Sequence, residues 1–263
     1  MSAYLNTSAA RVNDLIFSNT SPLKFILGQC SYDTNVLSTY SALVKILGSN
    51  FLFKVSWDKA NRTSHGAYRG LGMGAFMEFC FSFPGDIITD VHTCAEVSKL
   101  VTCVDAFQIP ALLCKQTDLL VEVGRTGKAV FIKKGQFASA SDMLKAADKV
   151  GENVVLVERG TFFGYNDLVV DYRNIALMKE RPVVLDITHS NNKQPAMSPH
   201  LARAATALGI AGIFAETHID PKLSLSDGEN MIGLDSLQEL VPDLRRLDRF
   251  IKKPHERKEM YGC

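Results

Sequence analysis

The chain has 263 residues, of which 46% are hydrophobic and 22% are charged, and its formal net charge is +1. This composition is typical of a globular protein with a sizeable core, and the charge balance argues against a nucleic acid or a membrane surface as the main partner. No apolar run approaches the ~18 residues of an ordinary transmembrane helix. The length suits either two ordinary domains or one β/α barrel, which typically takes about 250 residues.

The cysteines and the N-terminal residues indicate in which cellular compartment the protein is expected. The six cysteines have neither CxxC nor zinc-finger spacing, which predicts reduced thiols in a cytosol-like environment. Residues 1–22 contain no apolar segment of the secretory type. We therefore expect a cytoplasmic protein that acts on small molecules, with no nucleic acid and no membrane among its partners.

Eight short apolar runs alternate with helical patterns along the chain. Such runs are typical of parallel strands that are buried on both faces. We expect the strands within Lys24–Cys30, Phe51–Trp57, Asp86–His92, Ala106–Ala111, Lys128–Lys134, Asn153–Gly160, Pro182–Ser190 and Gly212–His218. Because no linker or change in composition interrupts the alternation, the sequence favours an α/β fold, a single (β/α)8 TIM barrel, over an open sheet.

Several helix ends are visible between the runs. Thr34 is placed to cap a helix that Gly48 ends. Ser139 and Asp142 have the spacing of a capping box, and Leu234–Ile251 has the amphipathic pattern of a closing helix. The pattern divides the chain into an N-terminal extension, the barrel and a polar C-terminal tail, at residues 1–23, 24–251 and 252–263.

Polar side chains at the ends of the apolar runs predict a shared site. Cys30 closes the first run, His189 lies in the end of the seventh, Glu216 lies in the eighth and Asp227 follows it. The carboxyl ends of the strands of a β/α barrel open toward one active site, and the first strand lies beside the last. One Cys, one His and two carboxylates suit a divalent metal such as zinc, iron or manganese. The alternative is that His189 and Cys30 are ordinary buried core groups.

Positive charges gather at the ends of three runs. They are Lys54, Lys59 and Arg62 in and after the second run, Lys133 and Lys134 at the fifth, and Arg159 at the sixth. Clustered cations are costly unless anions meet them, and Arg and Lys are the side chains that bind phosphate. We therefore expect a phosphorylated substrate with more than one anionic group. The alternative for the loop after the second run is a solvated basic surface.

Several segments between about Gly28 and Asp227 stand in the order of a known family. They are DKANRTS, YRG, ITDVH, QIPALL, QTDLL, KKGQF, ERGTFFGYNDLVVD, DITHS, and ETHIDP with SDG. In these segments the chain resembles 3-deoxy-manno-octulosonate 8-phosphate synthase. The resemblance implies a homotetramer that condenses phosphoenolpyruvate with D-arabinose 5-phosphate and water, as in lipopolysaccharide biosynthesis. Related synthases for heptulosonate phosphate or sialic acid share the barrel but are not expected to combine DKANR with FGYN.

The resemblance also implies roles for single side chains. Phosphoenolpyruvate is expected at Lys54, Lys59, Lys133 and Arg159. The sugar phosphate is expected at Asn61, Arg62, Thr63 and Ser64, with Lys115 at the position of an Arg that reaches a neighbouring subunit. Asp90, Gln108 and Gln136 are expected to line the cavity, and catalytic roles fall to Lys59, Asp90, His189 and Asp227.

The end of the first strand distinguishes two branches of that family. The metal-dependent branch has Cys there and the metal-independent branch has Asn. Cys30 therefore implies a metal user, completed by His189, Glu216 and Asp227. The chain departs from the family in Gln29, in Lys115 and in a short loop after His189, so a diverged phosphosugar-binding barrel with little or no turnover remains an alternative to the active synthase.

Overall fold

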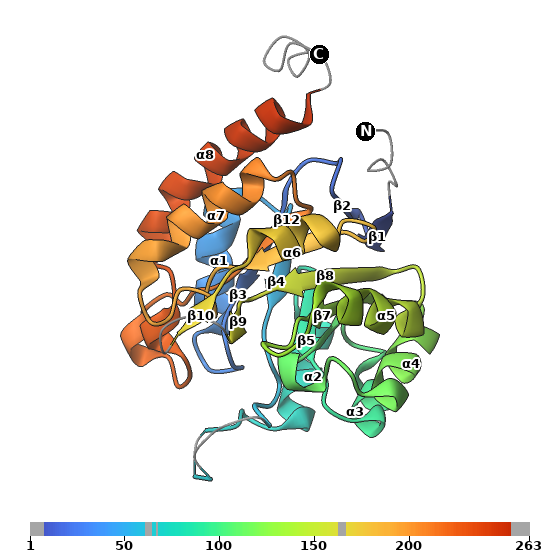
Figure 1. Cartoon of the computed structure of the whole chain (residues 1–263). Helices are drawn as coiled ribbons and strands as arrows, with labels where there is room; N and C mark the ends of the chain where they lie inside the picture. Colours follow the sequence, from blue (N-terminus) through green and yellow to red (C-terminus); the bar gives the residue numbers. More distant parts are fainter. Residues whose placement is uncertain (1–7, 61–64, 67, 163–166, 254–263) are drawn as a thin grey trace, which may run out of the picture.

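The computed structural model describes residues 8–60, 65–66, 68–162 and 167–253. Its central feature is a closed barrel of eight parallel strands, which confirms the predicted (β/α)8 fold (Figure 1). The strands are β3 (Lys24–Gly28), β4 (Leu52–Lys54), β5 (Ile87–Asp90), β6 (Ala106–Ile109), β7 (Ala129–Lys133), β8 (Val154–Glu158), β11 (Val183–Asp186) and β12 (Gly212–Glu216). Each lies within one of the eight apolar runs. The last strand, β12, pairs with the first, β3, and closes the barrel.

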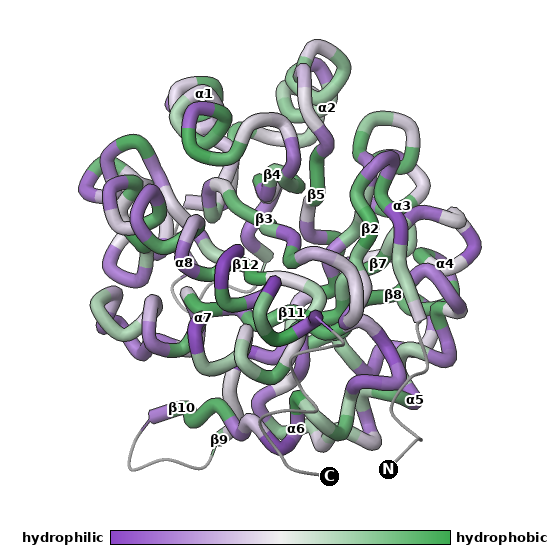
Figure 2. The backbone as a smooth tube through the Cα atoms, turned by 90° about the horizontal axis from the view of Figure 1, so that it is seen from above, coloured by the Kyte–Doolittle hydropathy of each residue, from purple (hydrophilic) through white to green (hydrophobic). Residues whose placement is uncertain are grey.

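The helices form a ring around the strands (Figure 2). They are α1 (Val36–Leu47), α2 (Met73–Ser82), α3 (Cys94–Leu100), α4 (Thr117–Arg125), α5 (Ala140–Val150), α6 (Tyr172–Leu177), α7 (Ser198–Ala207) and α8 (Leu234–Lys252). The predicted capping box of α5 is confirmed, since Ser139 and Asp142 each accept a backbone hydrogen bond from the other. None of the described helices combines the length and the apolar character needed to cross a membrane.

The predicted start of α1 is wrong by one residue. The helix is preceded by Asn35, whose side chain makes no capping hydrogen bond, and not by Thr34. The carboxylate of Asp33 accepts a hydrogen bond of 2.7 Å from the N–H of Asn35, so an earlier side chain satisfies the backbone at this end. Gly48 ends the helix as predicted, with a positive φ of 71° that glycine adopts readily.

An N-terminal hairpin closes the amino-terminal end of the barrel. It consists of the antiparallel strands β1 (Ala9–Val12) and β2 (Leu15–Ser18), and β1 lies against β7 and β8. Its buried apolar side chains join the cluster that fills the barrel interior, and the rings of Phe17 and Phe131 meet edge to face with centroids 5.0 Å apart. Removing this apolar surface from water stabilises the barrel.

The side chains that point into the barrel change from apolar to polar along the strands. Successive side chains of a strand alternate between its two faces, so residues two apart share a face. On β4 the inward series passes from Leu52 to Lys54, and on β5 it passes from Ile88 to Asp90. On the other six strands the inward series also ends in a polar side chain at the carboxyl-terminal end of the barrel. These side chains are Gln108, Lys133, Arg159, Asp186, Glu216 and Cys30. This polar layer is the candidate site.

Candidate functional site

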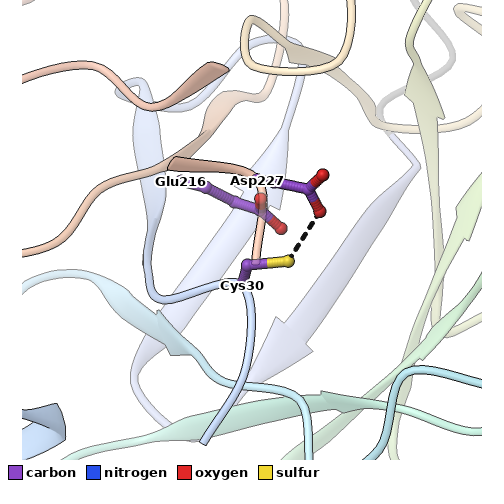
Figure 3. A group of neighbouring side chains, drawn as sticks. All are labelled: Cys30, Glu216 and Asp227. Atoms are coloured by element: carbon purple, nitrogen blue, oxygen red, sulfur yellow. Dashed lines mark hydrogen bonds between the residues drawn. The ribbon is translucent and has the colours of Figure 1, made fainter. Parts of the chain in front are cut away.

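Three of the four predicted metal ligands lie together in the polar layer. The Sγ of Cys30 and one carboxylate oxygen each of Glu216 and Asp227 lie within 4.8 Å of one another, and the side chains point toward a common centre (Figure 3). Cys30 follows β3 and Glu216 ends β12, and these strands pair directly. Barrel closure thus brings together groups that are far apart in the sequence.

Burial and charge set the protonation of this group. Burial and the neighbouring Glu216 raise the pKa of the Cys30 thiol, which donates a hydrogen bond of 2.9 Å to Oδ2 of Asp227. Burial acts to raise the pKa of Asp227, but the hydrogen bond from Cys30 and the charge of His189 outweigh it and lower this pKa. Oε2 of Glu216 is buried and has no hydrogen-bond partner among the described residues. A buried acceptor without a partner is suited to a cation.

The fourth predicted ligand, His189, lies beside this group and not within it. Its Nδ1 lies 2.7 Å from Oδ2 of Asp186, and it contributes to lowering the pKa of Asp227. Because Nδ1 is engaged, Nε2 is the nitrogen that remains for a ligand. A carboxylate that holds the other ring nitrogen is the usual support of a metal-binding histidine.

Sequence reasoning assigned no role to Asp186, which ends β11. The carboxylate is fully buried and also lies 2.8 Å from Nζ of Lys133. Burial acts to raise its pKa, but His189 and Lys133 lower this pKa far below its ordinary value. One signal was present in the sequence: a carboxylate inside the apolar run PVVLDITHS must be paired when it is buried.

A second network surrounds Asp90 at the end of β5. Its carboxylate accepts hydrogen bonds from Ser56, at 2.7 Å, and from Gln108, and it lies 3.6 Å from Nζ of Lys54 and 3.4 Å from Nζ of Lys59. The two lysines hold the pKa of Asp90 well below its ordinary value despite burial. Burial lowers the pKa of Lys54 to about 8. The structure therefore brings these predicted residues together as one fixed, charged unit.

Arg159 supplies an unsatisfied cation directly after β8. Its guanidinium is largely buried, and Nε and Nη1 have no hydrogen-bond partner among the described residues. Burial lowers its pKa, opposed by the charges of Asp186 and Glu158. The nearby Lys133 is already paired and stands 3.9 Å above the ring of Phe214. A guanidinium with free donors is suited to bidentate contact with a carboxylate or a phosphate.

Lys134 does not belong to the cationic cluster of the site, contrary to the expectation. Its ammonium is fully buried and lies 3.4 Å from Glu158, and it donates to the backbone oxygens of Gly135 and Gly160 and to Thr161. Because Lys133 faces the interior, its neighbour must face the surrounding helices. Lys134 therefore stabilises the turn after β8 through these hydrogen bonds.

The remaining predicted side chains lie at the margin of the site or beyond the described residues. Lys115 is exposed and pairs with Asp142 at 3.1 Å, so within the chain it does not reach the polar layer. Oε1 of Gln136 is buried and has no hydrogen-bond partner in the part of the chain that the structure describes. Asn61, Arg62, Thr63 and Ser64 fall outside the described residues.

Comparisons with known proteins show which family the chain resembles. The model of the DAHP synthetase I family matches residues 6–253. A 2-dehydro-3-deoxyphosphooctonate aldolase of Bartonella bacilliformis is 41% identical over 269 residues, which cover 93% of this chain and 95% of the relative. Its counterpart in Bartonella tribocorum is 42% identical over 268 residues, covering 92% and 96%. Another from Methylobacterium radiotolerans is 42% identical over 270 residues, covering 92% and 95%.

The name of these relatives denotes the synthase that the sequence motifs resemble, so the resemblance is confirmed. The identity extends over more than nine tenths of this chain and of each of these three relatives. The residues that the family model matches, 6–253, include all eight strands of the barrel. The chain belongs to the DAHP synthetase I family.

Proposed function

We propose that the protein condenses phosphoenolpyruvate with D-arabinose 5-phosphate and water, giving 3-deoxy-D-manno-octulosonate 8-phosphate and phosphate. The name of the relatives supports this reaction. The observation that carries it is the largely buried guanidinium of Arg159, whose Nε and Nη1 have no partner among the described residues. A binding site for an anion explains this arrangement, since an unsatisfied buried cation is otherwise costly.

The cations of the polar layer would orient phosphoenolpyruvate. Arg159 and Lys133 lie at the ends of the neighbouring strands β8 and β7, so their charges can act on one anion. Lys54 and Lys59 are held by Asp90 on the other side of the barrel. Because these groups are fixed before the substrate arrives, little reorganisation opposes attack of carbon 3 of phosphoenolpyruvate on the sugar aldehyde and of water on carbon 2.

The same end of the barrel fits a divalent metal. Cys30, Glu216 and Asp227 would hold it together with Nε2 of His189, and the partnerless oxygen of Glu216 supports this set. A bound ion would supply Lewis acidity beside the substrates. Zinc, iron and manganese all suit a donor set of one thiolate, one imidazole and two carboxylates.

The loop after β4 would receive the sugar phosphate. Arg69 donates two hydrogen bonds to the carboxylate of Asp58, and the N–H of Lys59 donates to the carbonyl of Arg69 at 3.0 Å. These contacts join the two ends of the loop and fix its base. Asn61, Arg62, Thr63 and Ser64, which lie between those ends in sequence, would contact the phosphate.

We also propose a cytoplasmic homotetramer. The side chains of Leu112, Phe137 and Phe162 follow β6, β7 and β8 and are exposed. Apolar side chains of this size on one end of a barrel are suited to subunit contacts. Lys115 lies near Leu112 in sequence and would point from this surface toward a neighbouring subunit's site. Sedimentation equilibrium would report the mass, and a monomer would contradict the assembly.

Phosphate release tests the proposed reaction. Release should require both phosphoenolpyruvate and arabinose 5-phosphate, should fall when a chelator removes the metal and should return when a divalent ion is added. Replacing the sugar with erythrose 4-phosphate is the control for a related synthase. Binding of both substrates without any product would favour the diverged barrel over the synthase.

A further inference from the structure

Ser226 has no role in the assignments above, although it contacts the candidate metal group. Its side chain is buried, and its Oγ lies 2.9 Å from Sγ of Cys30. The same hydroxyl donates a hydrogen bond of 3.1 Å to Oδ2 of Asp227, which is also the acceptor of the Cys30 thiol. One hydroxyl thus touches two of the three clustered side chains, and the three contacts form a closed triangle.

The backbone of the loop after β12 holds this hydroxyl in place. Asp227 has a φ of 55°, in the left-handed region that non-glycine residues rarely adopt. A Cβ built at Gly228 would lie 2.3 Å from the carbonyl oxygen of Pro221, so the chain packs closely here. Oγ of Ser224 donates a hydrogen bond of 2.7 Å to the carbonyl of Ser226. These contacts constrain the backbone from which the side chains of Ser226 and Asp227 project.

We propose that Ser226 is a positioning residue of the metal site, whose hydroxyl donates a hydrogen bond to the sulfur of Cys30 when a divalent metal is bound. This inference rests on the proposed metal site. Cysteine binds metals as the thiolate, so the thiol proton leaves to solvent and the sulfur becomes an acceptor only. The hydroxyl has one hydrogen, and once the thiol proton has left, the negatively charged sulfur at 2.9 Å is a nearer acceptor for it than Oδ2 of Asp227 at 3.1 Å.

Such a hydrogen bond has two consequences. It fixes the direction of the sulfur lone pairs and so reduces the cost of ordering the ligand on binding. It also withdraws electron density from the sulfur, which raises the energy of charge transfer from sulfur to metal. Partners of this kind are typically worth about ten- to hundredfold in metal affinity.

Cobalt(II) titration of the metal-free protein tests the role of Ser226. The near-ultraviolet absorption from sulfur-to-cobalt charge transfer reports both affinity and band position. Ser226→Ala should weaken Co²⁺ binding about ten- to hundredfold and move the band to longer wavelength. Ser226→Thr keeps the hydroxyl and should retain parent values. Ser31→Ala is the matched control, because Ser31 is buried next to Cys30 and its Oγ has no hydrogen-bond partner within the described ranges.

Parent-like affinity and band position in Ser226→Ala would overturn the inference, and so would equal effects of Ser31→Ala. Circular dichroism verifies folding, and if Ser226→Ala does not fold, the isosteric pair Ser226→Thr and Ser226→Val makes the same comparison. A parent that binds no Co²⁺ would refute the metal site and this inference with it. Equal Co²⁺ binding by parent and Ser226→Ala would refute only the role of Ser226, and phosphate release by the parent reports separately on the proposed reaction.

Discussion

Replacing Arg159 with Met removes the guanidinium and keeps most of the side-chain volume. In the substrate-free protein two of its nitrogens are buried without partners among the described residues, and such donors cost about 1–3 kcal/mol each. We therefore expect Arg159→Met to have a free energy of unfolding equal to that of the parent or about 1 kcal/mol higher. With substrate bound, the guanidinium should gain a charge-assisted contact worth about 1.5–3 kcal/mol. Its loss corresponds to about a ten- to hundredfold rise in the Kd of phosphoenolpyruvate.

Two measurements separate binding from stability at this position. Isothermal titration calorimetry gives the Kd of phosphoenolpyruvate without the sugar, and urea unfolding gives the free energy of unfolding. Arg173→Met is the control, because Arg173 is exposed and pairs with Asp171 outside the barrel. An unchanged Kd would place Arg159 outside the phosphoenolpyruvate site. A loss of more than about 3 kcal/mol of stability would instead show that the guanidinium supports the fold.

Three further predictions follow from the buried charges. Lys134→Met should cost about 3–5 kcal/mol of unfolding free energy by urea denaturation, because it leaves Glu158 buried without its cation, and parent-like stability would contradict the pairing. Asp186→Asn should weaken Co²⁺ binding about ten- to hundredfold, because the amide can donate a hydrogen bond to Nδ1 of His189 and so place the ring proton on Nε2, the nitrogen proposed to bind the metal. An unchanged Co²⁺ titration would show that Asp186 does not orient the ring of His189. Burial lowers the pKa of Lys54 to about 8, whereas the pKa of a lysine in the unfolded chain is about 10.4. Between these two pH values the unfolded chain binds more protons than the folded protein. The free energy of unfolding should therefore rise with pH in this range through Lys54. Calorimetry should show phosphoenolpyruvate binding weaken as pH rises through about 8, and a flat profile up to about pH 10 would contradict a role for the Lys54 ammonium.

The eight strands could be predicted because each depends on a local pattern. A strand buried on both faces must be apolar along its whole length, and this composition is visible without any knowledge of its neighbours. The capping box of α5 was visible for the same reason, since Ser139 and Asp142 are three residues apart and satisfy each other's backbone. The convergence of Cys30 and Glu216 followed from barrel closure alone, because the first and last strands must pair.

The tertiary structure alone decided which polar side chain faces which neighbour. Lys133 and Lys134 are equivalent in the sequence, but only Lys133 faces the interior, because strand register sets which of two adjacent residues points inward. Lys133 meets Asp186, and Ser226 meets Cys30, through contacts between residues far apart in the sequence, which depend on how the barrel closes and on the backbone of the loop after β12. Local pattern thus determined which residues occur at the strand ends, whereas register and closure determined their partners, because partners distant in sequence are selected only when the strands pair.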